Sequence, residues 1–291
     1  ITTRLVGSEM CIRDRTIGML MATFIVSLVT LFSEEQFLSW GWRIPFLLSS
    51  VLVLIGLWIR KDIDETPEFK QVKQSGQVAK APLRDTLKYH WREVLIAAGL
   101  KVVETAPFYI FSTFVVSYAT TTLSYQKSQA LEAVTLGALV ATVMIPLMGL
   151  LSDRIGRQKM YTLSVVLLGL FIVPWFLLLD TRSTWGIALA TVIAFGILWA
   201  PVTAVLGTLC SEIFSANVRY TGITLGYQLG AALAGGTAPL IATGLLAKYD
   251  GDWIPVAWYL AGTVVISLIA IFCASRLKQA PGAVATRSEM L

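Results

Sequence analysis

Two charged side chains lie inside one otherwise apolar run of the chain. Lys101 and Glu104 belong to the run Val94–Ala119, and a charge at the centre of a membrane span costs about 2.5–3.5 kcal/mol on insertion scales. Their i, i+3 spacing places both on one helix face. The lysine can then attract an anionic group while the glutamate exchanges a proton. We favour such a working site over a purely structural ion pair, because apolar residues would avoid the cost altogether.

Further polar side chains lie at a similar depth or nearer the surface. They are Tyr109, Tyr227 and Gln228. Each is a candidate contact for a small polar ligand, although an interhelical hydrogen bond would satisfy the same groups. Pro107 follows Glu104 by about one turn, where a kink can open space beside the charged pair. With Lys101 and Glu104, these residues form the predicted substrate and proton site.

A second group of candidates occupies a short polar turn between two apolar runs. Its sequence is Gly149-Leu-Leu-Ser-Asp153-Arg154-Ile-Gly156-Arg157-Gln-Lys159. Gly149 permits close helix contact, and Gly156 permits a bend that a Cβ would hinder. Asp153 can cap a helix or pair with a base, while the bases Arg154 and Arg157 anchor the turn at the membrane surface. The preference for basic residues on the cytoplasmic side explains the arginines, but it does not explain an acid and two glycines at fixed places. We therefore predict that this turn is a conformational gate.

Glu212 and Arg219 flank the next turn on the same side of the predicted fold. The simplest interpretation is an ion pair at the surface, which contributes little to stability when it is exposed. The alternative is that both residues belong to the gate. The sequence leaves these two possibilities open.

The elements that must position these residues are membrane-spanning helices. Hydrophobic residues make up 56% of the chain and charged residues 14%, whereas soluble domains carry about 25% charged residues. The apolar runs are continuous and long enough to cross a bilayer as helices, and they lack the alternation of barrel strands. Eight runs are predicted to span: Thr16–Phe32, Gly41–Ile59, Val94–Ala119, Leu131–Leu151, Tyr161–Leu179, Trp185–Ser211, Gly222–Ala247 and Ile254–Ser275. Small residues cluster in Gly222–Gly244, which indicates tight helix packing.

The charged loops predict the orientation. Fifteen Lys and Arg residues fall on one side of the predicted spans and four on the other, and the positive-inside rule places the fifteen in the cytoplasm. Both ends of the chain are then cytoplasmic. The net charge of +5 is explained by this asymmetry, so no nucleic-acid partner is expected.

The hydrophilic stretch 60–92 divides the chain. We interpret it as a cytoplasmic linker between two helices in 16–59 and a complete six-helix bundle in 93–276, followed by a cytoplasmic tail in 277–291. Residues 1–15 are interpreted as a non-native leader. No phosphate-binding loop, metal-like cysteine spacing or nucleophile–base set is found in the sequence, so no cofactor, metal or enzyme activity is expected.

The Gly149–Lys159 turn resembles the G-x-x-x-D-R-x-G-R-x-[KR] loop signature of the major facilitator superfamily. That signature recurs after the second and eighth helices of a twelve-helix fold, so the resemblance implies a fragment that runs from about helix five to helix twelve. Three shorter strings look like the metabolite:proton symporter branch. They are Ser39-Trp-Gly-Trp-Arg-Ile-Pro-Phe46, Glu65-Thr-Pro-Glu-Phe69, and Glu212-Ile-Phe with Val218-Arg-Tyr-Thr-Gly222.

The resemblance implies proton-coupled symport of a small organic acid or zwitterion by alternating access, in a monomer of the inner membrane. It favours a gate role for Glu212 and Arg219 over a simple surface ion pair. The branch also carries a polar pair like Tyr227-Gln228. Two alternatives stay open: a drug or metabolite exporter of the same fold that works by proton antiport, and a membrane sensor that does not transport.

Overall fold

The computed structural model describes residues 82–214 and 218–279, together with scattered positions between 39 and 58. Contacts divide the chain into two compact units, Ile1–Val78 and Ala79–Leu291. The predicted run Thr16–Phe32 lies outside the described residues, and Gly41–Ile59 is described only in part. The count of eight spans and the domain boundaries therefore stay predictions, and the helices below belong to the second unit.

Each regular element of residues 82–214 and 218–279 is helical. In chain order the elements are α5 (Pro82–Tyr89), α6 (Trp91–Tyr109), η2 (Ile110–Phe114), α7 (Val115–Thr121), α8 (Lys127–Ile155), α9 (Arg157–Asp180), α10 (Thr184–Thr191), η3 (Val192–Leu198), α11 (Trp199–Ser211), α12 (Arg219–Gly230), η4 (Ala231–Gly235), α13 (Ala238–Lys248) and α14 (Ile254–Gln279). The η segments are single stretches of π-helix, in which one extra residue widens the turn.

Six segments of the described residues are long and apolar enough to cross a membrane. Each contains one of the last six predicted runs; for example, the predicted run Val94–Ala119 lies within Trp91–Thr121. The observed helices extend a few residues past the apolar runs, because polar residues at the membrane surface continue the helical hydrogen bonding. This confirms the prediction of an all-α membrane protein.

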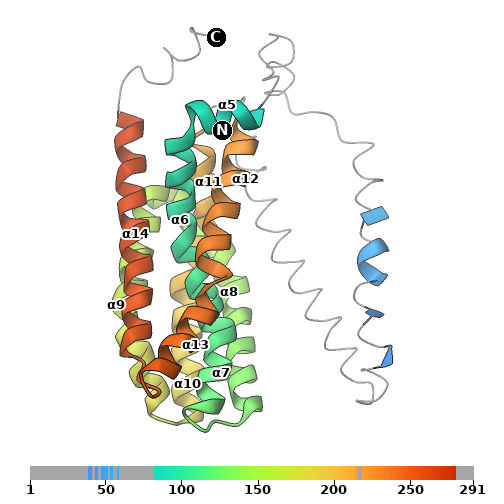
Figure 1. Cartoon of the computed structure of the whole chain (residues 1–291), viewed down its shortest axis with the longest axis vertical. Coiled ribbons are helices and arrows are strands. Elements are labelled where there is room, and N and C mark those ends of the chain that lie inside the picture. The colour runs from blue at the N-terminus through green and yellow to red at the C-terminus, as the bar shows by residue number, and fades with distance from the viewer. Residues whose placement is uncertain are drawn as a thin grey trace. The chain divides into compact units, whose positions relative to one another are not determined.

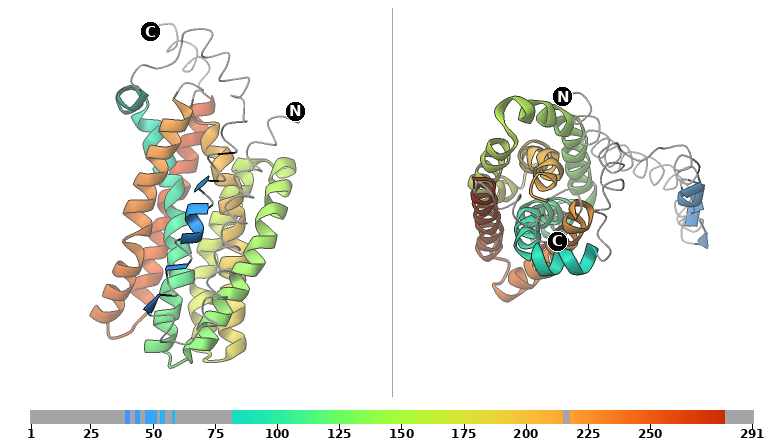
Figure 2. Two further views of the ribbon diagram at one scale, coloured as in Figure 1. Left: turned by 90° about the vertical axis from the view of Figure 1, so that its right-hand side faces the viewer. Right: turned by 90° about the horizontal axis from the view of Figure 1, so that it is seen from above.

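The six spans run side by side as one bundle (Figure 1). The segment α10–η3–α11 lies in the middle of the bundle when it is viewed from above (Figure 2). It packs against α8 and α9, and α11 also contacts α6. The spans that begin with α6 and α10 are the most buried, while α8 is the most exposed. The residues that carry the site on α6 and α11 therefore lie in the interior.

Glycines let α12 and η4 pack directly on α6. A Cβ at Gly226 would lie 2.6 Å from the Ala97 Cβ, and one at Gly230 would lie 2.6 Å from the Ala98 carbonyl oxygen. At Gly235 a Cβ would collide with Thr105. These contacts confirm the close packing predicted from the small residues of Gly222–Gly244, and they set the distance between α6 and α12.

Gly230→Ala is expected to lower the free energy of unfolding by about 1–3 kcal/mol, the usual range for overpacking. The added methyl group would meet the Ala98 carbonyl oxygen and the Lys101 Cβ at 2.6 and 2.7 Å, and backbone cannot move aside cheaply. Gly244→Ala is the matched control, because a Cβ there has no described atom within 4 Å. Equal unfolding midpoints for the two variants in detergent would contradict the prediction.

Candidate functional site

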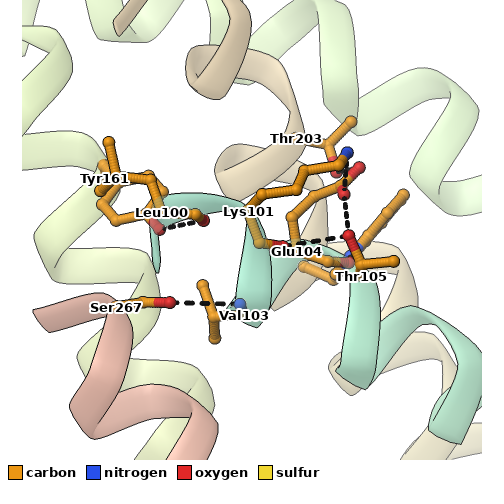
Figure 3. Close-up of polar contacts among 9 residues, drawn as sticks. Leu100, Lys101, Val103, Glu104, Thr105, Tyr161, Thr203 and Ser267 are labelled. Atoms are coloured by element: carbon orange, nitrogen blue, oxygen red, sulfur yellow. Dashed lines mark hydrogen bonds and ion pairs between the residues drawn. The ribbon is translucent and has the colours of Figure 1, made fainter. Parts of the chain in front are cut away.

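The helix α6 carries the two charged residues into the bundle. Lys101 and Glu104 lie about 15 and 20 Å along the helix from Trp91, at 1.5 Å per residue, which is near the middle of a 30 Å hydrocarbon core. Lys101 is 7% exposed and Glu104 is 1% exposed. The lysine Nζ and the glutamate Oε2 form an ion pair, shown in Figure 3. The predicted proximity of the two charges is thus present in the structure.

Hydroxyl groups complete the surroundings of the Glu104 carboxylate. The Thr105 Oγ1 lies 3.0 Å from Oε2 and the Thr203 Oγ1 of α11 lies 3.5 Å from Oε1. A hydroxyl can donate to a carboxylate or accept from a protonated carboxyl. The Thr105 proton can turn instead to the Lys101 carbonyl oxygen, which is also 3.0 Å away. The site can therefore accommodate either protonation state of Glu104 by rotating hydroxyl groups.

The Tyr227 ring of α12 covers the other side of the lysine. The Lys101 Nζ lies 4.8 Å from the ring centroid, within the range of a cation–π interaction. Gly230 permits this approach, because it lets α12 lie directly against the Lys101 side chain. The ammonium group therefore contacts a carboxylate on one helix and an aromatic ring on another.

Three neighbouring helices hold the backbone of the charged turn. The Tyr161 hydroxyl of α9 donates to the Leu100 carbonyl oxygen at 2.6 Å, and the Trp199 Nε1 of α11 donates to the Glu104 carbonyl oxygen at 2.6 Å. The Ser267 hydroxyl of α14 donates to the Gly99 carbonyl oxygen at 2.7 Å. It accepts from the Val103 N–H at 3.1 Å, as Figure 3 shows. These are the two groups that an α-helix joins directly, so Ser267 supports the ladder there.

Sequence reasoning missed these supporting residues. Trp199 offered a signal, because it lies inside an apolar run, whereas tryptophans of membrane helices are enriched near the span ends. The hydroxyls of Tyr161, Thr203 and Ser267 offered none, since a lone hydroxyl in an apolar helix most often bonds its own backbone. Thr162 and Ser164 do so, each donating to the carbonyl oxygen four residues earlier.

The other two predicted ligand contacts do not touch the charged pair through the described hydrogen bonds. Tyr109 is 38% exposed, and its ring lies 5.4 Å from that of Phe108. Phe108 in turn contacts Phe195 and Trp199, at 5.6 and 5.3 Å between centroids. Gln228 is exposed. The structure brings Tyr227 to Lys101, but it places Tyr109 beyond an aromatic cluster and Gln228 on the outer side of α12.

The polar turn between α8 and α9 brings three of the predicted gate residues together. Gly156 joins the helices with φ of 98°, a conformation that L side chains rarely adopt, so the predicted need for glycine is confirmed. The Arg157 guanidinium bonds Glu212 Oε1 at 2.7 Å and Asp153 Oδ1 at 3.4 Å. A single arginine thus links the end of α8 to the end of α11.

The remaining gate candidates are placed differently. Arg154 is exposed, and Arg219 donates from Nε to the Phe214 carbonyl oxygen at 3.4 Å. A Cβ at Gly149 would have no described atom within 4 Å, so the close helix contact predicted there is absent from the described bundle.

Comparison with protein families decides the identity of the fold. The model for the Major Facilitator Superfamily matches residues 12–235 and, in an overlapping match, residues 102–289. The chain belongs to the major facilitator superfamily. This confirms the resemblance carried by the Gly149–Lys159 turn. No solved structure matches the chain.

Several curated transporters are similar in sequence to the chain. It is 34% identical over 259 residues to the shikimate transporter of Escherichia coli, covering 88% of this chain and 59% of the relative. It is 30% identical to the glycine betaine/proline/ectoine/pipecolic acid transporter of Dickeya dadantii, over 85% of this chain and 51% of the relative. The alpha-ketoglutarate permease of Escherichia coli is 30% identical, over 87% and 57%.

These relatives are named as transporters or as a permease, and the family match confirms the predicted membership of the major facilitator superfamily. The chain spans between half and three-fifths of the length of the curated relatives it matches. The six described spans and the family together place it among multi-pass membrane proteins.

Proposed function

We propose that this chain is part of a secondary active transporter that carries a small organic acid or zwitterion together with a proton by alternating access. The single observation that carries the proposal is the buried Lys101–Glu104 pair near the middle of a span. Ionisable groups at that depth are costly, and in membrane proteins they mark substrate and ion pathways. The midplane is also where alternating-access transporters bind their substrates.

In this proposal each site residue has a distinct role. Lys101 attracts the anionic group of the substrate, and the Tyr227 ring steadies the ammonium while it changes partners. Glu104 takes up a proton when the substrate displaces it from Lys101, and Thr105 and Thr203 adjust their hydroxyl groups to the new state. Tyr109 and Gln228 are proposed to contribute further contacts in the complete transporter.

The names of the relatives support the substrate class. They are given as transporters of shikimate, of glycine betaine and proline, and of alpha-ketoglutarate, which are carboxylates or zwitterions with a carboxylate. A lysine beside an exchangeable glutamate suits that shared group. We propose that the protein is an inner-membrane monomer with both termini in the cytoplasm.

An uptake assay tests the function. The full-length transporter, reconstituted in vesicles, is expected to accumulate at least one radiolabelled carboxylate, from a panel holding shikimate, 2-oxoglutarate and glycine betaine, when the lumen is made alkaline. Collapse of the pH gradient should abolish accumulation but leave exchange. The 291-residue chain alone is the control and should not accumulate any of them, because an alternating-access site lies between two halves. Accumulation that does not depend on the pH gradient would contradict proton symport.

We also propose that the turn between α8 and α9 is a gate. Asp153, Arg157 and Glu212 form one charged network between two helix ends. A charge at a helix end contributes about 0.3–1 kcal/mol of interaction energy with the helix dipole. That energy is enough to bias two conformational states that differ by a few kcal/mol. Asp153→Asn in the full-length protein should therefore shift the balance of inward- and outward-open states. Ile155, which is exposed and has no role in the proposed gate, provides a cysteine position whose labelling reports both the sidedness and the shift. Unchanged labelling in the Asp153→Asn background would leave the turn as an anchor only.

A further inference from the structure

The short helix α5 lies across the end of the bundle and not along it. Figure 1 shows α5 crossing above the start of α6, and in Figure 2 the same helix is seen end-on at the edge of the bundle. The bend at His90 separates it from α6, which begins one residue later. Since α6 enters the membrane at Trp91, α5 runs parallel to the membrane plane at the level of the span ends.

The faces of α5 differ in chemistry. Leu83 is 55% exposed and Leu87 is 51% exposed, whereas Thr86 is fully buried. At 3.6 residues per turn the two leucines share one stripe, and Arg84 with Lys88 form the stripe beside it. Thr86 lies opposite the basic stripe. The buried side therefore faces the bundle, where α5 contacts α6 and α12, and the leucines and bases face outward.

Aromatic residues continue this outward surface into α6. Trp91 is 49% exposed, and the Arg92 guanidinium lies 5.4 Å from its ring centroid. The Lys88 Nζ lies 5.0 Å from the Tyr89 ring centroid. Tyrosine and tryptophan gather where a membrane meets water, because one end of each ring system is apolar and the other is polar.

We propose that α5 is an interfacial helix that binds the headgroups of anionic phospholipids. Leu83 and Leu87 insert at the boundary of the acyl chains, while Arg84, Lys88 and Arg92 contact lipid phosphates. The helix combines an apolar stripe with basic residues beside it, which is the pattern of helices that lie in the membrane surface. Bases at such a surface are attracted by anionic lipids.

The acids of the segment do not cancel this attraction. Glu93 Oε1 lies 3.7 Å from the His90 Nδ1, and the same segment holds three bases, Arg84, Lys88 and Arg92. Asp85 is the remaining acid in 82–93, which keeps an excess of basic residues. Because α5 is joined to α6 by a single bend residue, the lipid contact also fixes the start of the helix that carries Lys101 and Glu104.

Fluorescence quenching tests the lipid contact on the chain itself. A Leu87→Cys variant is labelled with an environment-sensitive dye in a background in which Cys11 and Cys273 are alanine. Cys210 is kept, because it is buried and the dye does not reach it. The protein is placed in phosphatidylglycerol vesicles and in phosphatidylcholine vesicles. We expect strong quenching by a lipid-borne spin label. Quenching by aqueous acrylamide, which is neutral and is not repelled by an anionic surface, should be several-fold weaker in phosphatidylglycerol than in phosphatidylcholine.

Neutralising Arg84, Lys88 and Arg92 to glutamine should remove the difference between the two lipids, and Lys88→Gln alone should reduce it. The matched control neutralises three bases at the other end of the bundle, Lys127, Arg182 and Lys248, and should preserve the difference. Equal acrylamide quenching in both lipids would overturn the proposal. Protection from both quenchers would also overturn it, because a protein segment would then cover α5. So would a lipid difference that survives the triple variant, provided that the circular dichroism is unchanged.

Discussion

Lys101→Met is expected to lower the free energy of unfolding by about 3–5 kcal/mol, the cost of removing one partner from a buried ion pair. Methionine keeps the volume of the side chain but leaves the Glu104 carboxylate, which is 1% exposed, without its cation. The Thr105 and Thr203 hydroxyls remain beside it, and neutral donors compensate a buried charge only in part. Glu104→Gln alone should cost less, because the Lys101 ammonium keeps the Tyr227 ring as a partner.

The double variant Lys101→Met/Glu104→Gln provides the decisive comparison. With both charges removed, no uncompensated charge stays buried, so the double variant should recover most of the stability lost by Lys101→Met. Lys248→Met is the control, since Lys248 is exposed at the end of α13. Unfolding midpoints in detergent are measured for the four variants and the parent. A double variant that is as unstable as Lys101→Met, or a Lys101→Met variant within about 1 kcal/mol of the parent, would show that the pair does not carry the expected electrostatic energy.

The spans could be predicted because bilayer thickness fixes their length and composition. A run such as Tyr161–Leu179 has no soluble alternative, and the observed helix Arg157–Asp180 exceeds it only at the ends. The turn at Gly156 could also be predicted, because glycine readily adopts the positive φ that a sharp turn between two helices requires. Local chemistry therefore determined the helices and the turn that joins α8 to α9.

The partners of the site could not be predicted, because they come from distant parts of the chain. Glu104 meets Trp199, which is 95 residues away, and Val103 meets Ser267, which is 164 residues away. The presence of a hydroxyl or an indole in an apolar helix does not reveal which distant residue will be its hydrogen-bond partner. The pairing of Glu212 with Arg157 was hidden for the same reason.

The π-helical segments were also absent from the sequence prediction. Three occur in the described residues, within the spans that begin with α6, α10 and α12, and these spans supply Glu104, Thr203 and Tyr227. An extra residue in a helical turn shifts the residues after it around the axis, so a strict 3.6-residue pattern misplaces their faces. Thr203 is the site residue that follows such a segment, because η3 ends at Leu198, whereas Tyr109 and Gln228 precede η2 and η4.

Glu104→Gln in the full-length transporter is expected to abolish proton-driven accumulation and to preserve exchange of substrate across the membrane. With the membrane potential clamped at zero, each pH unit supplies about 1.4 kcal/mol per proton, so a one-proton symporter concentrates its substrate about tenfold per pH unit. Glutamine mimics the protonated carboxyl and can bond to Thr105 and Thr203, so the loaded site still forms and reorients. It cannot release a proton, so the inward and outward states no longer sense the gradient.

The measurement compares the accumulation ratio and the rate of counterflow at several external pH values. For Glu104→Gln the ratio should fall to about one, because no free energy from the gradient reaches the substrate, and counterflow should lose its pH dependence. Glu132→Gln is the matched control, since Glu132 is exposed on α8, and it should behave like the parent. If Glu104→Gln still concentrates substrate with the parent's pH dependence, the proton travels by another residue. The buried pair would then have to be explained by packing, although its cost at mid-span makes that explanation the weaker one.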